Sequence, residues 1–203
     1  MAHQVRGARD ADCGAIPRPV QRSRPDARPD YRQYRDDVRA DFNRQCGYCT
    51  VSETEAVVET HELDHYWPQK IRPDLAHAFA NLVLCCRPCN GKKWSRPPHH
   101  PQDPSLMIVR PDDHEPSDHY AMDGLRIQGR TPAGRFSADL LDLNRQPLLE
   151  MRRRRRRDAE TDATLASVLK MASSVGLDAF RPPLRWQWRK IVQAAAKQLG
   201  TKR

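Results

Sequence analysis

Two pairs of cysteines have the spacing of metal ligands. Cys46 and Cys49 are separated by two residues, and so are Cys86 and Cys89. This spacing lets both thiolates of a pair face one tetrahedral Zn²⁺ at about 2.3 Å, so two pairs predict a structural zinc site. Cys85 is an alternative ligand, but the two-residue spacing favours Cys86. A redox dithiol at one pair is the other interpretation.

The 36 residues between the two pairs contain the side chains that one-metal phosphodiester hydrolysis needs. Asp64 and His65 lie in a strand-like stretch, Asn81 opens the next one, and Asn90 directly follows Cys89. Carboxylate and amide oxygens suit Mg²⁺, and a histidine can deprotonate water near neutral pH. Because neighbouring residues of a strand point to opposite faces, Asp64 and His65 require a twisted or terminating strand.

Short elements have to position these side chains. Apolar residues at helical spacing predict a helix over residues 31–45, which leads into Cys46. Residues 51–67 are strand-like, 68–78 form a proline-containing loop, and 79–85 predict a short buried strand. On a regular strand His61 would share a face with His65, and we expect His61 at the surface.

The second half of the chain predicts loops, one hairpin and several helices. Residues 95–118 are rich in proline and histidine and predict mostly loop. Asp123-Gly124 predicts the turn of a hairpin within residues 119–137. The helical pattern that follows covers residues 140–151 with an interruption near Pro147, then 159–175, then a last helix from about residue 182 to 199.

The composition favours a basic, intracellular protein with a small core. Aromatic residues make up 6% of 203 residues, so a bound metal would help to stabilise the core. The formal net charge of +9 suits a polyanionic partner. The N-terminus has no apolar signal segment and no stretch is long and apolar enough for a membrane helix, so we expect a reduced, cytoplasmic protein without a membrane partner.

The order of the motifs over residues 42–94 resembles the HNH endonuclease family. A cysteine pair is followed by LDHYWPQ and then by NLVLCCRPCNGKK. The resemblance implies an α+β protein with a zinc-stapled ββα-metal core, preceded by the N-terminal helix and followed by a β-hairpin extension and a helical C-terminal region. We expect an arm at 1–30 that is mobile or depends on a partner, the core at 31–96, the loop and hairpin extension at 97–144, and a basic helical region at 145–203.

The resemblance also implies a role for each polar residue. His65 corresponds to the general base, and Asp64 and Asn90 correspond to the ligands of a catalytic Mg²⁺ or Mn²⁺. Asn81 corresponds to the asparagine that braces the loop and helps to orient the base. The structural zinc is assigned to Cys46, Cys49, Cys86 and Cys89. The third motif position is Asn90 instead of histidine, which favours an oxygen ligand. Outside this context His65 would be a hydrogen-bonded strand histidine, and Asn90 a turn residue.

Several basic residues are candidates for contact with nucleic acid. Lys92 and Lys93 follow Asn90 and can neutralise a phosphate, unless they are a solvated helix turn. Residues 152–157 are six consecutive arginines, which wrap around a helix instead of forming one stripe. We expect some of the run, Arg152, Arg153 and Arg156, to meet phosphate or an acidic partner, and the rest to be solvated.

Residues 97–157 resemble the extension downstream of HNH cores in the nuclease subunits of bacterial Septu-type and some retron anti-phage systems. The residues that carry this likeness are Asp103-Pro104, the hairpin with TPAG after it, and LLDLNR before the arginine run. The likeness implies DNA as substrate and an ATPase partner of the ABC or SMC type. The alternatives are a stand-alone HNH nuclease of the homing or toxin type, and a non-catalytic zinc-ribbon adaptor that binds nucleic acid or a partner.

Overall fold

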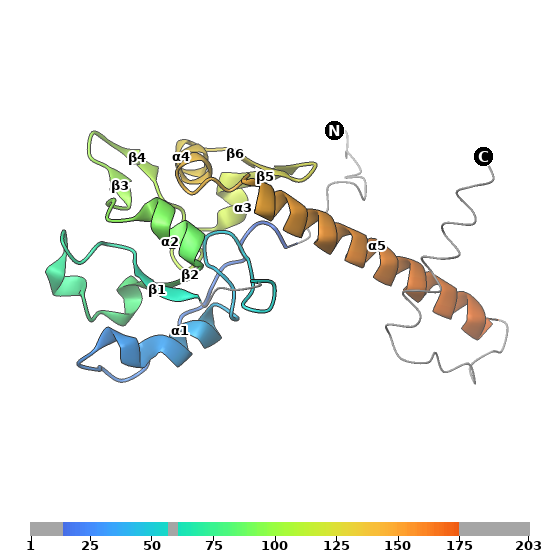
Figure 1. The fold of residues 1–203 in the computed structure, drawn as a ribbon, viewed down its shortest axis with the longest axis horizontal. Coiled ribbons are helices and arrows are strands. Elements are labelled where there is room, and N and C mark those ends of the chain that lie inside the picture. Colours follow the sequence, from blue (N-terminus) through green and yellow to red (C-terminus); the bar gives the residue numbers. More distant parts are fainter. Residues whose placement is uncertain (1–13, 57–60, 175–203) are drawn as a thin grey trace, which may run out of the picture. The chain divides into compact units, whose positions relative to one another are not determined.

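The computed structural model describes residues 14–56 and 61–174 (Figure 1). The chain divides into two compact units, residues 1–152 and 153–203. This boundary differs from the one expected at residue 144, because the last described helix begins in the first unit and continues into the second. Within the described ranges, no helix combines the length and the apolar composition needed to span a bilayer.

The centre of the first unit is an antiparallel pair of strands followed by a helix. Strand β1 (Glu62–His65) pairs with β2 (Leu82–Cys85), and α2 (Arg87–Lys93) follows β2 after one residue. All four residues of β2 are buried, because its apolar run is covered on both faces. Pro88 lies in the first turn of α2, where a missing N–H costs nothing. This arrangement confirms the predicted α+β fold with a ββα core.

Further short helices surround this core. The predicted N-terminal helix is a 3-10 helix, η2 (Tyr31–Tyr34), that continues as α1 (Arg35–Asp41). Its apolar side chains Tyr34, Val38 and Phe42 are buried in the core, as their spacing predicts. The connection between β1 and β2 contains two 3-10 helices, η3 (Pro73–Leu75) and η4 (Phe79–Asn81). The predicted buried strand therefore begins at residue 82 instead of 79.

The hairpin extension lies beside the core in the first unit. The predicted hairpin is confirmed, with β5 (Tyr120–Asp123) paired to β6 (Arg126–Gly129) and Gly124 in the turn at φ 59°. Residues 95–118 were expected to be mostly loop, but they contain paired strands and a short helix. The prolines and histidines of this range interrupt the periodic pattern of apolar residues from which strands and helices are predicted. These elements are β3 (His99–His100), β4 (Asp103–Met107) and α3 (Pro116–His119).

The helical tract is broken between residues 140 and 146. Helix α4 (Pro132–Leu140) ends where the predicted tract was expected to begin, and α5 (Gln146–Ser174) contains Pro147 in its first turn. Leu148 and Met151 of α5 are buried in the first unit, whereas residues 153–168 contain no buried side chain. The predicted amphipathic helix at 159–175 is thus part of one long helix, and the helix predicted from residue 182 lies outside the described residues.

The segment before the first helix is not a mobile arm over residues 14–30. The backbone N–H of Val20 donates to the carbonyl of Pro111 at 2.7 Å. The Arg22 guanidinium donates to the carbonyl of Leu82 at 2.7 Å and forms ion pairs with Asp41 and Asp112, each at 3.2 Å. The expectation was wrong there because a proline- and arginine-rich composition does not reveal long-range partners. Residues 1–13 lie outside the described residues.

Candidate active site and zinc centre

Four buried cysteines form one cluster at the end of the core. The sulfurs of Cys46, Cys49, Cys86 and Cys89 all lie within 4.8 Å of one another. The Sγ atoms of Cys49 and Cys86 are 3.5 Å apart, close to the roughly 3.8 Å edge of a tetrahedron with 2.3 Å Zn–S bonds. The four residues are therefore arranged to hold a zinc-like metal ion. Cys85 lies on β2 outside this set, as the two-residue spacing predicted.

An arginine that directly precedes α5 lies against the cysteine cluster. The Nη2 of Arg145 is 3.3 Å from the sulfur of Cys89, 3.7 Å from that of Cys49 and 3.8 Å from that of Cys86. With zinc bound, four thiolates would exceed the charge of one Zn²⁺, and this guanidinium would offset part of the excess. Sequence reasoning missed Arg145, because nothing in its neighbourhood indicates a partner so distant along the chain.

The carboxylate of Asp64 is buried between two partners. The hydroxyl of Tyr48 donates to Asp64 Oδ2 at 2.7 Å, and the ammonium of Lys93 lies 3.0 Å from Oδ1. Lys93 also donates to the carbonyl of His65 at 2.8 Å. Tyr48 belongs to the first cysteine pair's turn and Lys93 to α2, so both zinc-binding segments hold this carboxylate in place. Sequence reasoning missed the role of Tyr48.

The predicted contact of Lys93 with nucleic acid is wrong. Its side chain is fully buried and its ammonium is used by Asp64 and by the backbone of β1. Adjacent Lys92 is partly exposed and pairs with Asp142 at 3.0 Å, so it can still approach a phosphate. The two lysines point in different directions because successive residues of a helix are about 100° apart.

His65 has one ring nitrogen fixed and one available. Its Nε2 lies 2.9 Å from the carbonyl oxygen of Ala76, which can only accept, so Nε2 carries the proton and Nδ1 keeps its lone pair. The amide nitrogen of Gln69 also lies 3.1 Å from Nε2. When the Gln69 amide is flipped, its oxygen takes this place and accepts from the Nε2–H, so the contact fits this tautomer. Burial lowers the pKa of His65, although the hydrogen bond to Ala76 raises it, which favours the neutral imidazole.

Asn81 holds the loop that surrounds His65. Its Oδ1 accepts from the backbone N–H of Trp67 at 2.8 Å, and its Nδ2 donates to the carbonyls of Trp67 at 3.0 Å and Leu75 at 3.2 Å. Leu75 precedes Ala76, whose carbonyl holds the His65 ring. These contacts fit the bracing role that the resemblance implies for Asn81.

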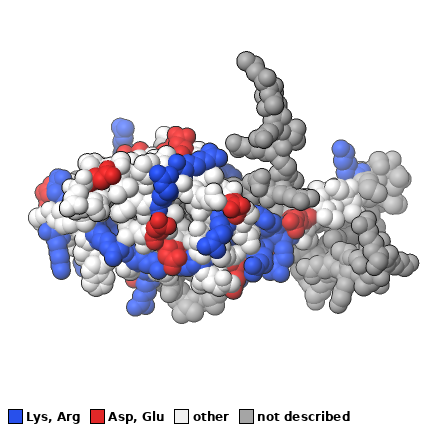
Figure 2. Space-filling model, turned by 90° about the horizontal axis from the view of Figure 1, so that it is seen from above, with Lys and Arg blue, Asp and Glu red and all other residues white. Residues whose placement is uncertain are grey.

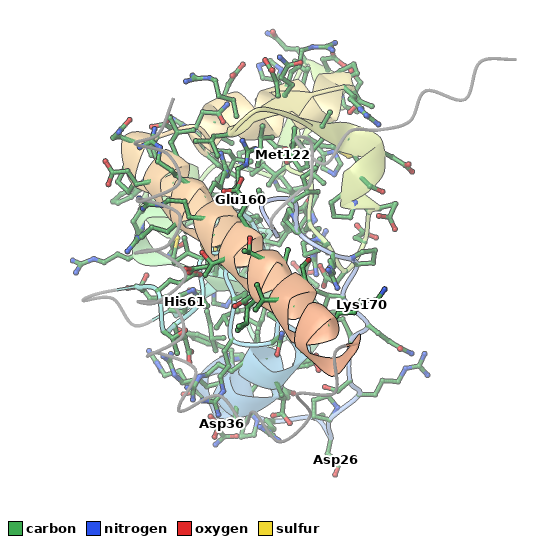
Figure 3. All side chains as sticks on the ribbon, turned by 90° about the vertical axis from the view of Figure 1, so that its right-hand side faces the viewer. Asp26, Asp36, His61, Met122, Glu160 and Lys170 are labelled. Carbon is green, nitrogen blue, oxygen red and sulfur yellow. The ribbon has the colours of Figure 1, made fainter. Side chains whose placement is uncertain are left out.

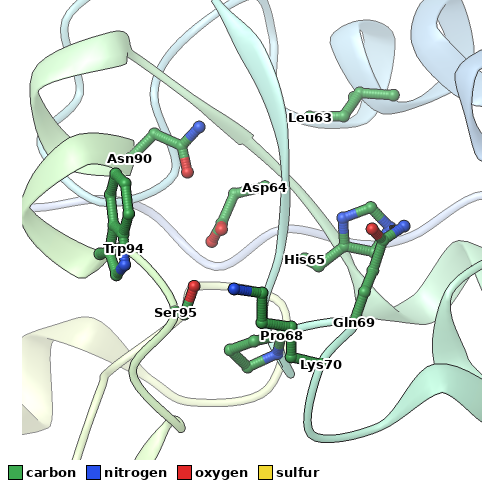
Figure 4. Close-up of a pocket in the computed structure, with 9 residues that line it drawn as sticks. All are labelled: Leu63, Asp64, His65, Pro68, Gln69, Lys70, Asn90, Trp94 and Ser95. Atoms are coloured by element: carbon green, nitrogen blue, oxygen red, sulfur yellow. Dashed lines mark hydrogen bonds between the residues drawn. The ribbon is translucent and has the colours of Figure 1, made fainter.

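Asn90 is oriented by a glutamate that sequence reasoning missed. Its Nδ2 donates to Glu62 Oε2 at 2.7 Å, so its amide oxygen is turned toward the side of Asp64 (Figure 4). Glu62 and Asp64 are two residues apart on β1 and therefore lie on the same face of the strand. The alternation of side chains along a strand could therefore have identified Glu62 from the sequence.

Asp64, His65 and Asn90 meet at one open cleft of about 240 Å³ (Figure 4). Two adjoining clefts share Asn90 and Glu62 and extend the surface toward α2 and η2. Basic side chains line these three clefts, namely Lys70, Arg87, Arg32 and Arg35. The site is thus a shallow groove with acidic and amide oxygens at its centre and cations around it.

His61 is not at the surface as expected. Its ring is buried, and its Nε2 lies 2.7 Å from the carbonyl oxygen of Val51. Figure 3 labels the position of His61. It precedes β1, so the strand alternation that was used to place it beside His65 does not apply.

The expected contact of Arg152 with nucleic acid is also wrong. Its guanidinium is buried and donates to the carbonyls of Leu143 at 2.7 Å and Leu125 at 3.0 Å, so it ties α5 to the hairpin extension. Arg153 and Arg156 belong to the second unit, and their contact with nucleic acid stays a prediction. In the described part of the face shown in Figure 2, basic side chains are scattered, with acidic ones between them.

Residues 46–96 match the family model of the HNH endonuclease. This segment is an HNH endonuclease domain. The HNH domain contains the cysteine cluster and every residue at the centre of the cleft.

The similarity extends beyond the HNH domain. The chain is 29% identical over 136 residues to the Septu protein PtuB of Bacillus thuringiensis. That alignment covers 67% of this chain and 50% of the relative, so the chain spans about half the length of the curated protein it matches. This relative confirms the predicted likeness to the Septu-type group. No solved structure gives a significant match.

Proposed function

We propose that the protein is a metal-dependent endonuclease that hydrolyses phosphodiester bonds of DNA. The observation that carries this proposal is the cleft of the HNH domain, where a histidine with a free Nδ1 lies beside a carboxylate and an oriented amide oxygen. A structural adaptor has no need of this combination, because a neutral histidine and hard oxygen ligands serve hydrolysis.

His65 acts as the general base in this proposal. Its Nδ1 takes a proton from a water molecule, whose oxygen attacks the phosphorus while the bond from phosphorus to the 3′ oxygen breaks. The products carry a 5′-phosphate and a 3′-hydroxyl after the leaving oxygen is protonated. The carbonyl of Ala76 keeps the ring in the tautomer that accepts this proton, and Asn81 holds the loop that presents this carbonyl.

Asp64 and Asn90 would hold the catalytic Mg²⁺ or Mn²⁺. A carboxylate and an amide oxygen are hard ligands that suit either ion. Both oxygens of Asp64 already accept a hydrogen bond, yet each keeps a further lone pair for a cation. When bound, the ion neutralises charge that builds up on the phosphate and on the leaving oxygen.

We further propose that the nuclease works in bacterial anti-phage defence together with an ATPase of the ABC or SMC type in the cytoplasm. The similarity to a Septu protein over two thirds of this chain supports the defence role. Within the described residues, no helix of a known base-reading motif accompanies the shallow cleft, so target choice would come from a partner or from the state of the DNA.

Cleavage of supercoiled plasmid tests the proposal. Wild type should convert the plasmid to nicked or linear DNA with Mg²⁺ or Mn²⁺, and His65→Ala should not, while zinc content stays equal. His99→Ala is the matched control, because His99 lies outside the cleft and should cut normally. Parallel reactions with and without any ATPase whose gene adjoins this one test the partner.

Bound DNA without cutting in every reaction, with zinc present, would contradict the nuclease and support the adaptor. Full cutting without any partner would instead favour a stand-alone nuclease.

A further inference from the structure

Trp94 presents a large aromatic surface at the rim of the cleft. Its side chain is 75% exposed, more than any other large hydrophobic residue in the described part of the chain. It lines two of the three adjoining clefts, and in each of them it lies together with Asn90 (Figure 4). The indole is therefore next to a proposed metal ligand and does not contribute to the core.

The backbone at Trp94 does not suit a tryptophan. Trp94 caps the C-terminus of α2 at φ 51° and ψ −141°, a left-handed conformation that favours glycine. Its N–H donates to the carbonyl of Asn90 at 2.7 Å, which fixes it against the helix. A bulky residue in such a conformation is strained, and strained residues gather at functional sites. Neither packing nor backbone preference explains the indole, so a ligand is the better explanation.

The surroundings of Trp94 identify the chemistry of that ligand. Arg87 lines one of its clefts and Lys70 lines the other, so each cleft that the ring lines also carries a cation. An exposed aromatic face next to cations is how proteins bind single-stranded nucleic acid, with bases stacked on rings and phosphates near the charges. A base inside a duplex has both faces covered by its neighbours, so only an unpaired or extruded base can stack on the indole.

We propose that Trp94 is a stacking platform for an unpaired nucleobase beside the phosphate that is cut. The preferred substrate is then single-stranded DNA or duplex DNA that is locally opened. This inference rests on the proposed nuclease function and adds the substrate class that its cleft selects.

Binding measurements in a His65→Ala background separate recognition from cutting. The probes are a short single-stranded DNA oligonucleotide, the matching duplex and the same strand as RNA, each with Mg²⁺ present. Adding Trp94→Ala should weaken single-strand binding by about 5- to 150-fold, whereas Trp94→Phe should keep most of it. Duplex binding should change little. Ile71→Ala is the matched control, because Ile71 is also exposed but does not line the clefts.

An abasic scan locates the stacked base. A single abasic nucleotide is moved along the oligonucleotide, and binding is measured with Trp94 present or replaced by alanine. One position should weaken binding when Trp94 is present and have no effect when it is absent. An equal loss at every position, or at none, would overturn the proposal.

The variant Trp94→Gly distinguishes a loss of binding from a loss of folding stability. Glycine adopts the backbone conformation of residue 94 without strain, so this variant should melt at a higher temperature while it loses single-strand binding. A lower melting temperature would show that the indole supports the fold and would overturn the proposal.

The remaining outcomes distinguish this inference from the proposed function. If wild type cuts plasmid but Trp94→Ala binds all probes normally, the proposed nuclease function is supported and the proposed stacking role of Trp94 is overturned. If Trp94→Ala binds DNA normally but no longer associates with the ATPase, Trp94 belongs to a protein interface instead. A stronger effect on the RNA strand than on DNA would move the substrate class to RNA and overturn the DNA assignment.

Discussion

Lys93 compensates the charge of Asp64 from within the core. Its ammonium lies 3.0 Å from Asp64 Oδ1, and both side chains are almost completely buried. An isolated buried carboxylate is strongly unfavourable, so the nearby ammonium offsets the loss of water around Asp64. The same ammonium donates to the carbonyl of His65, which ties α2 to the end of β1. The proposed ligand and the proposed base therefore depend on one side chain that never meets the substrate.

Lys93→Met should destabilise the fold strongly, because it leaves a buried carboxylate without its partner. We expect a loss of about 3–5 kcal/mol in the free energy of unfolding, measured by urea denaturation. Lys92→Met is the control. It breaks an exposed ion pair with Asp142 and should cost about 0–1 kcal/mol. Similar losses in the two variants would mean that the Lys93 pair contributes no more than a surface contact.

Glu62 sets the orientation of the Asn90 amide and is a positioning residue for the proposed metal. Glu62→Ala should lower the affinity for Mg²⁺ by about 10- to 100-fold, because the free amide can then turn its nitrogen toward the site. The measurement is the cleavage rate as a function of Mg²⁺ concentration, where excess Mg²⁺ should restore the rate.

Asn90→Asp supplies the control for Glu62. A carboxylate presents an oxygen in either orientation, so removing Glu62 in that background should cause no further loss. A loss of the same size in both backgrounds would contradict the orienting role and point to direct binding of the metal by Glu62.

Among the elements, α4 packs closely against the end of α3 at Gly134. A Cβ at Gly134 would collide with the carbonyl oxygen of His119, where α3 ends. Thr131 caps α4 and accepts from the N–H of Gly134 at 3.0 Å, so the first turn of the helix has no freedom to move away. The position therefore requires glycine because of close packing and not because of its backbone angles.

Gly134→Ala should destabilise the fold by about 1–3 kcal/mol, because the added methyl group forces α4 away from α3. Gly91→Ala is the matched control in another helix, α2, where a Cβ would meet nothing within 4 Å. That variant should raise stability by about 0.5–1 kcal/mol, measured by thermal or urea denaturation. A neutral Gly134→Ala would show that α4 can shift at no cost.

The elements differ in how much of them the sequence revealed. The cysteine pairs and the hairpin at Gly124 follow from local spacing and turn chemistry, and the β1–β2 pairing follows from the resemblance to the HNH family; all three are present. The partners of the site do not follow, because Tyr48 reaches Asp64 across 16 positions and Arg145 reaches Cys49 across 96. Lys93 was misplaced for the same reason, since only its distant partner makes its burial favourable.

At the scale of the whole molecule, the sequence carries a net charge of +9, and the face shown in Figure 2 has basic and acidic side chains mixed. The groove is lined by cations of its own, such as Arg32 and Arg35. The arginine run begins with Arg152, which is buried and supports the fold. The run therefore has two roles. Its first residue anchors α5 in the first unit, and the residues after it are exposed or half-buried.

Replacing both Arg153 and Arg156 with glutamine should reduce the salt dependence of DNA binding. If each contacts one phosphate, the slope of log K against log salt should fall in magnitude by about 2, measured by fluorescence anisotropy in the His65→Ala background. Arg135→Gln, an exposed arginine on α4, is the control and should leave the slope unchanged. An unchanged slope in the double variant would show that the run is solvated.

Cys89 and Asn90 are consecutive residues of α2, so the helix that completes the zinc cluster also carries the proposed catalytic ligand. One inserted residue between them would turn Asn90 by about 100° around the helix axis while all four cysteines remain. The spacing between the zinc cluster and the proposed ligand is therefore fixed. An insertion here would leave the four cysteines in place, but it would turn both the proposed metal ligand and the Lys93 partner of Asp64 away from the cleft.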